Sequence, residues 1–342
     1  MWQLLLHLGR LSQPGSRKGA MATYCISDIH GALDEFRRLL NKVGFRYDGT
    51  DELYILGDIG DWGTRSMETI LHVKAMEELY PFVHVLMGNH ELMFLDAISH
   101  AGQGLIPDDT DYNWLYPNHG EGTWKSFCEL PLEEQVDLYQ WLLVRPYSWD
   151  IRIGDRLYMA AHAYPYYYDQ EAADSEERRR KQCDTVWRRL LIREDPFAEY
   201  TGEKHYDTLI CGHTITDFYY TRLRYERNWP YRKPGEYVRN RAFFAERFID
   251  IDCGAKCIEM AQDRRELLQT AALRAQLCAL RLEDMKTFYC RKSQIRLPDA
   301  QELQESLQYS EDAIREVYRE QEMRMNEIRD SFRNFFRRWR ER

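Results

Sequence analysis

The sequence lacks a long hydrophobic run, a positive net charge and a secretory leader pattern. None of its apolar runs approaches the ~20 residues that a membrane-spanning helix needs. The first apolar run is interrupted by His7 and Arg10 and has no basic segment before it, which argues against a signal peptide. The formal net charge of −9 argues against general nucleic-acid binding. We therefore expect a protein without a transmembrane segment, located in the cytoplasm.

The cysteines follow no pairing pattern either. The eight cysteines are scattered, and Cys25 and Cys211 lie inside apolar runs, where a reduced thiol packs as a small hydrophobic group. Cys253 and Cys257 have no second Cys or His pair at matching spacing, so a thiolate metal site is not indicated. This usage is typical of free thiols in a reducing compartment.

What the sequence does contain is an alternation of short apolar runs and helical patterns, typical of a layered α/β fold. We expect strands near residues 22–27, 52–57, 82–88, 156–163, 207–213 and 247–254, then further strands at 255–260 and within 277–290. Residues 21–290 form the predicted catalytic domain. Residues 1–20 are expected to be a disordered extension, or to precede a start at Met21. Residues 291–342 are predicted to be a charged, amphipathic C-terminal helix.

Polar residues follow nearly every apolar run. They stand in the segments "SDIHG", "GDIGD", "GNHE", "AAHA" and "CGHT", and the candidates are Asp28, His30, Asp58, Asp61, Asn89, His90, His162 and His213. In α/β sheets, ligands gather outside the carboxyl ends of the strands, so these side chains should share one crevice. Oxygen and imidazole ligands without thiolate suit manganese, iron or zinc. The number of ligands and a carboxylate able to bridge indicate two divalent ions, with manganese preferred.

These five segments together resemble the metallophosphoesterase signature, and more narrowly the bacterial phosphoprotein phosphatase (serine/threonine protein phosphatase-like) family. Further similar segments are "NWLYPNHGEGT" (113–123), "TVWRRL" (185–190) and "FIDIDCG" (248–254). The resemblance implies a four-layer fold, in which a central β-sandwich is flanked by helices and carries a dinuclear metal site at the strand ends. It also implies hydrolysis of phosphomonoesters, phosphoserine and phosphothreonine in proteins first, by attack of a hydroxide that bridges the ions.

The resemblance assigns roles residue by residue. Asp28, His30 and Asp58 would hold one ion, and Asp58 would bridge to the second. The remaining ligands of the second ion would be Asn89, His162 and His213. His90 would protonate the leaving group as the general acid, with Asp61 orienting its imidazole.

Trp62 departs from the family pattern, which has a phosphate-binding arginine there. An indole cannot donate the paired hydrogen bonds of a guanidinium, so Arg65 and Arg189 are the candidates for gripping the phosphate. Trp62 itself could wall the cleft or stack on a nucleobase. The alternative substrate is therefore a dinucleoside polyphosphate of the diadenosine tetraphosphate type. An alternative of another class is an inactive phosphatase-fold binding module that acts through the basic tail.

Two further segments are candidates for recognition. Residues 219–247 carry eight Arg or Lys, three Glu and many aromatics, suited either to a phosphorylated or nucleotide-like substrate or to covering a sheet edge. In the tail, one helical face carries Phe332, Phe335, Phe336 and Trp339. We expect this face to dock on the catalytic core or on a second subunit, in preference to a membrane surface.

Overall fold

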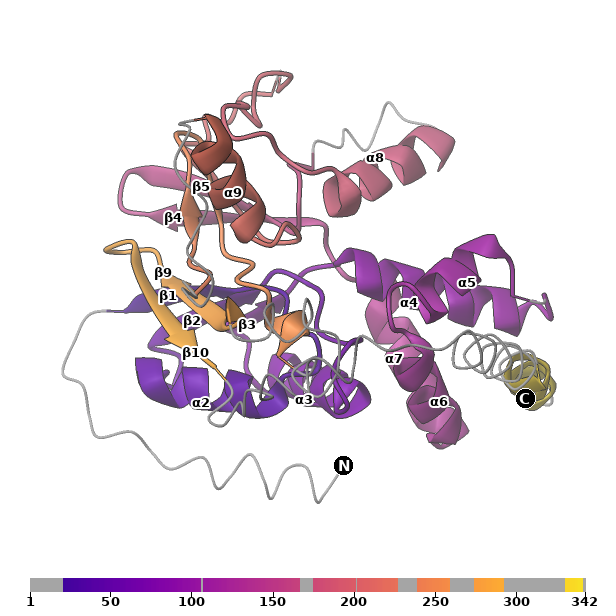
Figure 1. Ribbon diagram of the computed structural model, residues 1–342. Coiled ribbons are helices and arrows are strands. Elements are labelled where there is room, and N and C mark those ends of the chain that lie inside the picture. Colours follow the sequence, from indigo (N-terminus) through magenta and orange to yellow (C-terminus); the bar gives the residue numbers. More distant parts are fainter. Residues whose placement is uncertain are drawn as a thin grey trace, which may run out of the picture.

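Two five-stranded β-sheets form the centre of the part of the chain that the structure describes (Figure 1). The computed structural model describes residues 21–105, 107–166, 175–200, 202–226, 239–258, 274–291 and 330–340. The first sheet has the order β10-β9-β1-β2-β3, from Lys286–Cys290, Leu277–Arg281, Ala22–Ile26, Asp51–Ile55 and Val83–Val85. The second has the order β4-β5-β6-β8-β7, from Ser148–Ile153, Arg156–Ala161, Thr208–Cys211, Phe248–Asp250 and Phe243–Phe244.

The strands that precede the polar segments run parallel within each sheet. β1 pairs with β2 and β2 with β3, while β5 pairs with β6 and β6 with β8, all in parallel register. Because parallel strands end at the same edge, the loops after them open on one side of each sheet. This arrangement brings the predicted ligand loops together.

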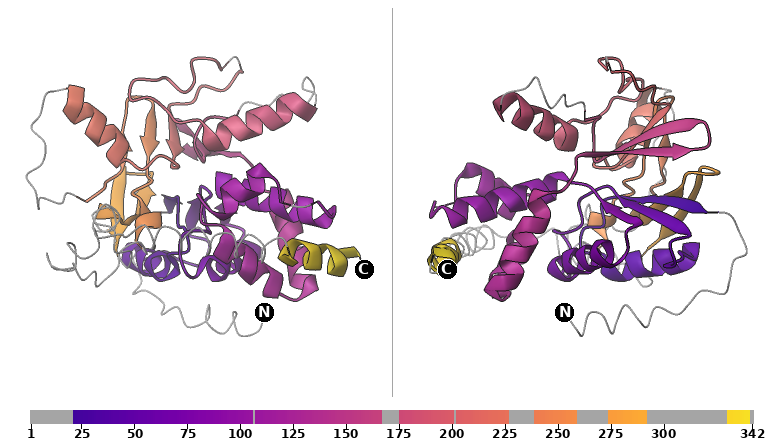
Figure 2. Two further views of the ribbon diagram at one scale, coloured as in Figure 1. Left: turned by 45° about the vertical axis from the view of Figure 1, so that its right-hand side comes forward. Right: turned by 180° about the vertical axis from the view of Figure 1, so that it is seen from behind.

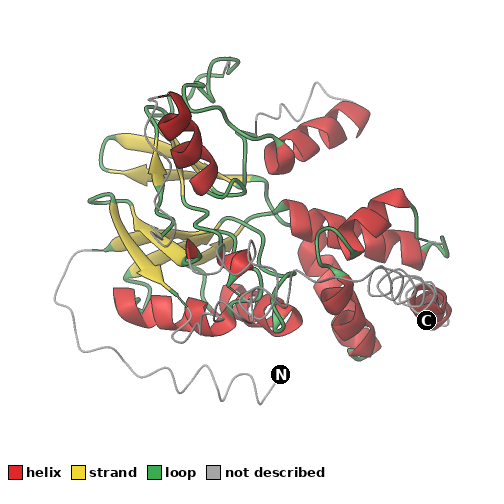
Figure 3. Cartoon of the chain, viewed as in Figure 1, coloured by secondary structure: helices red, strands yellow, loops and turns green. Residues whose placement is uncertain are grey.

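Apolar side chains fill the space between the two sheets and cover both outer faces. Between the sheets lie residues such as Tyr54, Leu56, Ile210 and Ile249. Helices α2 (Leu33–Val43) and α3 (Ser66–Leu79) pack on the outer face of the first sheet, and α9 (Asp217–Glu226) packs on the second. Figure 3 shows the helices outside the stacked sheets. The four-layer α/β fold predicted from the sequence is confirmed.

A group of helices extends from one side of the sandwich. It consists of α4 (Asn89–Gly102), α5 (Asp109–Leu115), α6 (Glu121–Glu129) and α7 (Leu132–Leu143), and α8 (Ser175–Trp187) lies near them. Phe94, Trp114, Trp124 and Phe127 are buried where α4, α5 and α6 meet. The group begins with α4, whose first residue is the predicted ligand Asn89. Residues 113–123, another segment of the family resemblance, run from the end of α5 to the start of α6.

The final helix, residues 330–340, packs against this helical group (Figure 2, yellow). Phe332 and Phe335 are 1% and 0% exposed. The ring centroids of Phe332 and Trp124 are 4.1 Å apart. Trp124 Nε1 also donates a hydrogen bond to Ser331 Oγ at 2.6 Å. The apolar face predicted for the tail is thus turned to the chain's own helices, whereas self-association through the tail stays a prediction.

One predicted strand is wrong, and several segments lie outside the described residues. Ala255–Cys257 forms a short 3-10 helix, although the apolar run at 255–260 predicts a strand. Gly254, at φ 79°, turns the chain away from the sheet before that strand could form. The predicted extension (1–20), much of the 219–247 segment and most of the tail are not among the described residues. No described helix is long and apolar enough to span a bilayer.

The packing of the final helix yields the first testable prediction. Phe335→Ala should release residues 330–340, because truncating a buried phenylalanine costs roughly 3–5 kcal/mol. We expect limited proteolysis to cleave this helix at least about ten times faster than in the wild type. Arg337→Ala, on the exposed side of the same helix, is the matched control and should leave the rate unchanged. Equal rates in the two variants would show that the docking does not depend on this contact.

Candidate metal centre

The six predicted metal ligands converge at the carboxyl ends of the strands. Asp28 and His30 follow β1, Asp58 follows β2, and Asn89 begins α4 after β3. His162 and His213 follow β5 and β6 of the second sheet. All six residues are buried, with exposed fractions between 0% and 6%. The two sheets therefore contribute to one centre.

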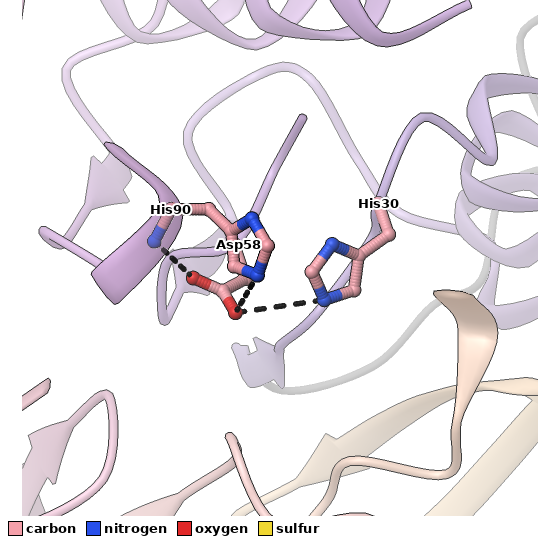
Figure 4. Close-up of side chains that lie close together, drawn as sticks. All are labelled: His30, Asp58 and His90. Atoms are coloured by element: carbon pink, nitrogen blue, oxygen red, sulfur yellow. Dashed lines mark hydrogen bonds and ion pairs between the residues drawn. The ribbon is translucent and has the colours of Figure 1, made fainter. Parts of the chain in front are cut away.

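Asp58 lies between the imidazoles of His30 and His90 (Figure 4), and His162, which follows a strand of the second sheet, lies near its other oxygen. Its Oδ2 is 3.5 Å from His30 Nε2 and 3.9 Å from His90 Nε2, while its Oδ1 is 3.4 Å from His162 Nε2. Two groups of potential ligands share this carboxylate. They are His30, Asp58 and His90, and Asp58, His162 and His213, with the ligand atoms of each group within 4.8 Å of one another.

Asn89 joins the second group and Asp28 borders the first. Asn89 Oδ1 is 2.9 Å from His162 Nε2 and 3.0 Å from His213 Nδ1. Asp28 Oδ1 is 3.8 Å from His30 Nε2. The first group of ligand atoms consists of His30, Asp58 and His90. The family resemblance instead names Asp28 as the third ligand of that ion. All the predicted ligands are nevertheless brought together.

The backbone around the centre is held in an unusual conformation. Six of its non-glycine residues have φ between 47° and 66°, in the left-handed region: Asp28, His30, Asp58, Asp61, Trp62 and His213. Each such residue costs roughly 1–3 kcal/mol and persists only when its surroundings fix it. Gly88 and Gly212 are required here, because a Cβ would lie 2.4 Å from Asp58 Oδ1 or 2.1 Å from Asp28 Oδ2, respectively.

Glu91 fixes the backbone of the loop that carries Asp58. Its carboxylate accepts hydrogen bonds from the backbone N–H of Asp58 at 2.7 Å, Ile59 at 2.8 Å and Gly88 at 3.1 Å. Burial, together with the charge of Asp58, raises the pKa of Glu91. Glu91 therefore ties the start of α4 to the loop after β2 and sets where the Asp58 side chain points.

The charge balance of the site fits cation binding. Burial, reinforced by Asp252, raises the pKa of Asp28 to about 8. Burial alone would raise the pKa of Asp58, but His162 and His90 hold it well below its usual range. Burial and the neighbouring His90 lower the pKa of His30, which favours the neutral imidazole that binds a metal. Buried carboxylate oxygens, an amide oxygen and neutral imidazole nitrogens form a donor set suited to divalent cations.

His90 and Asp61 form a buried pair next to the centre. His90 Nδ1 is 2.6 Å from Asp61 Oδ2. Burial would lower the pKa of His90, but the charges of Asp58 and Asp61 raise it. Trp114 Nε1 donates to Asp61 Oδ2 at 2.6 Å, and the Thr123 hydroxyl donates to its Oδ1. The position of the Asp61 carboxylate is thus set by the helical group.

The three predicted substrate-binding residues occupy different environments. Arg189 Nη1 donates to the backbone oxygen of His213 at 3.2 Å, so it lies beside a predicted ligand. Arg65 donates to Asp34 and Glu68, at 2.6 Å each. Its guanidinium is therefore engaged by two carboxylates.

Trp62 is half-buried and stacks on His119, with ring centroids 3.9 Å apart and an interplanar angle of 28°. Its buried Nε1 finds no acceptor among the described residues. Lys256 Nζ lies 5.3 Å from the centroid of the indole. One face of the indole is thus taken by the protein itself, and a cation stands close to it.

Several residues of the site were missed by sequence reasoning. Asp252 is buried, and its charge acts on Asp28, but in the sequence it was read only as part of a closing strand. A carboxylate at the end of a predicted buried strand was the signal, as it was for Asp58. Trp114, Thr123 and Lys256 carried no comparable signal, since their roles arise from contacts between distant segments.

Comparisons with known proteins give a family and several relatives for this chain. A model of the calcineurin-like phosphoesterase family matches residues 21–217. The chain is 33% identical over 122 residues to a protein of Buchnera aphidicola subsp. Acyrthosiphon pisum (strain Tuc7) named bis(5'-nucleosyl)-tetraphosphatase, symmetrical, covering 36% of this chain and 37% of that protein. A protein of the same name from Neisseria meningitidis serogroup A is 33% identical over 145 residues, covering 42% of this chain and 45% of that protein.

The chain thus spans less than half the length of these two curated relatives. Among solved structures, a metallophosphoesterase from Sphaerobacter thermophilus is 18% identical, with a TM-score of 0.40 over 86% of this chain and 97% of that chain. The family match covers more than half of the 342 residues and includes every predicted metal ligand. The chain therefore belongs to the calcineurin-like phosphoesterase family.

Proposed function

We propose that this protein hydrolyses dinucleoside polyphosphates with the help of two divalent cations. The sharing of Asp58 by two groups of buried ligands is the observation that supports a dinuclear centre. The names of the relatives favour a dinucleoside polyphosphate over a phosphoprotein. Phosphoserine or phosphothreonine is the second candidate, supported by the motifs shared with the bacterial phosphoprotein phosphatases.

The ligands proposed for the two ions are Asp28, His30, Asp58, Asn89, His162 and His213. When bound, such ions would stabilise the charge on the transferred phosphoryl group and lower the pKa of a water molecule. The protein's own part is to hold the carboxylates and imidazoles in place. Buried ligands on two rigid sheets, braced by Glu91, suit that task.

His90 is proposed to protonate the departing oxygen. Its Nδ1 faces Asp61, so its Nε2 is the atom available for proton transfer. A carboxylate that accepts from the imidazole stabilises the protonated form and fixes its orientation. Because Trp114 and Thr123 also donate to Asp61, this carboxylate has little freedom to turn away from His90.

Lys256 is proposed to supply positive charge on the substrate side. Asp34 and Glu68 already bind the Arg65 guanidinium and would compete with a phosphate for it. The Lys256 ammonium lies beside Trp62. The charge of Lys256 also acts on His30 and His213, so it faces both groups of ligands. Trp62, supported by His119, would form a wall of the cleft beside this cation.

Asp58→Asn tests the metal centre. Removing the shared charge should lower metal content below two ions per chain and abolish hydrolysis. Metal analysis and assays on diadenosine tetraphosphate, a phosphoserine peptide and p-nitrophenyl phosphate, each with Mn²⁺ and with chelator, measure this. Faster wild-type turnover of the phosphopeptide than of diadenosine tetraphosphate would reverse the order of the two candidates. Absence of any hydrolysis by metal-loaded wild type would favour the binding-module alternative.

Thr123→Val tests the positioning of Asp61. The substitution keeps the shape but removes one donor, which is worth about 1.5–3 kcal/mol when the acceptor is charged. We expect kcat for p-nitrophenyl phosphate to fall about tenfold, with metal content unchanged. Thr69→Val is the matched control, because Thr69 is also buried but donates to the backbone oxygen of Arg65, just before α3. A similar loss of kcat in the control would assign the effect to general destabilisation.

Lys256→Met and Arg65→Met separate the two candidate cations. If Lys256 contacts the phosphates, its removal should lower kcat/KM for diadenosine tetraphosphate about tenfold or more. Arg65→Met should change kcat/KM less than about threefold, since its partners are protein carboxylates. The reverse pattern would restore Arg65 as the phosphate-binding residue.

A further inference from the structure

A second cationic site lies at the outer edge of the first sheet, away from the predicted ligands. It is a cavity of about 760 Å³ between α2, the edge strand β10 and the segment before β7. Figure 1 shows α2 beside β10. The cavity is lined by five cationic side chains: Arg38, Lys42, Arg239, Arg241 and Arg291. None of these residues belongs to the metal centre.

The cavity is positively charged on a chain whose net charge is −9. No carboxylate is among its lining residues, although Glu35 pairs with Arg38 at 2.6 Å. Within the described part of the chain, Arg239, Arg241 and Arg291 have no side-chain hydrogen bond or ion pair. Like charges held close together repel one another, so an anion bound here would relieve repulsion among these groups.

The backbone that carries two of these arginines is fixed. Asn240, between Arg239 and Arg241, is 7% exposed. Its Nδ2 donates to the Cys253 backbone oxygen at 3.1 Å, and its own backbone oxygen accepts from Gln276 Nε2 at 2.5 Å. The two guanidiniums are thus attached to a rigid frame, which lowers the entropy lost when they bind a ligand.

The opposite wall is anchored as well. Lys42 Nζ donates to the Tyr289 backbone oxygen at 2.8 Å, and Arg38 donates to the Arg291 backbone oxygen at 3.1 Å. The Arg38 Nε is buried and has no acceptor among the described residues. The hydroxyl of Thr287 and the amide of Gln276 add polar groups to the lining.

Strand pairing separates this cavity from the catalytic centre. β10 pairs with β9, and β9 with β1, so β10 lies two strands, or about 10 Å, from β1. Cys290 pairs with Leu277, beyond the level at which Ala279 pairs with Ile26. Cys290 and Arg291 are therefore at the same end of the sheet as Asp28, but to one side of it.

We propose that this cavity binds a small polyanion with at least two adjacent phosphate groups, at a site separate from the metal centre. Guanidinium groups bind phosphate oxygens in pairs, and several converging guanidiniums match a chain of phosphates better than one. The volume lies in the ~300–1,000 Å³ range of small-molecule pockets. Either a nucleotide or an inorganic polyphosphate carries this chemistry.

Calorimetry on the metal-loaded protein tests the proposal with methylenediphosphonate and α,β-methylene-ADP, whose P–C–P bridges resist hydrolysis. The wild type should show two binding sites per chain. The variant Arg239→Ala/Arg241→Ala should weaken the second site by about tenfold or more and leave p-nitrophenyl phosphate hydrolysis near the wild-type rate. The matched control Arg152→Ala/Arg156→Ala removes the same charge from exposed positions in the β4–β5 hairpin and should retain both sites.

The two probes distinguish the sources of the phosphates. Tighter binding of α,β-methylene-ADP at the second site would identify a nucleotide, and equal binding would identify the phosphate chain alone. No site that is weakened by Arg239→Ala/Arg241→Ala, or equal weakening by the two double variants, would overturn the proposal. Failure of the metal centre would remove only the site that this double variant leaves intact, so the two failures are distinguishable.

Discussion

The buried carboxylate of Asp58 imposes the main electrostatic constraint on this protein. It stands within 4 Å of three imidazoles that come from the loops after β1 and β5 and from the start of α4. Glu91, also buried, holds the turn that presents Asp58, and six residues around the site have left-handed backbone conformations. A site with so much buried charge and strain needs rigid support, which two packed sheets and three well-placed backbone N–H donors supply.

That support reaches further than the sheets. Phe332 of the final helix packs on Trp124, and Trp124 packs edge-to-face on Trp114, which donates to Asp61. Thr123, the neighbour of Trp124, donates to the other oxygen of the same carboxylate. The final helix is thus connected by direct contacts to the residue that orients His90. A displacement of Trp124 would therefore reach Asp61 through Trp114 and Thr123, because tightly packed side chains transmit strain to their neighbours.

Site residues could be predicted from the sequence where their position depends on the neighbouring strand, and not where it depends on contacts with distant parts of the chain. Asp58 and His162 were found because each follows a buried strand directly, and strand ends share an edge whatever the details of packing. Asp61's partners in the helical group were not found, because Trp114 and Thr123 are 53 and 62 residues away from it. The strand expected at 255–260 failed because apolar residues after a glycine turn fit a short buried helix equally well. The position of Lys256 beside Trp62 could not be predicted for the same reason, because it depends on this short helix.

The distribution of charge bears on which phosphates this protein can hold. A net charge of −9 repels polyanions in general, but beyond a Debye length of about 8 Å at physiological salt that repulsion is largely screened. Binding therefore depends on local cations, and the described residues supply them in two places. One is Lys256 beside Trp62, and the other is the group of arginines around β10. Both are compact, and neither offers the long basic surface that a nucleic acid needs. Small ligands with a few closely spaced phosphates gain most from such clusters, because they meet several cations at once while exposing little charge to the rest of the acidic surface.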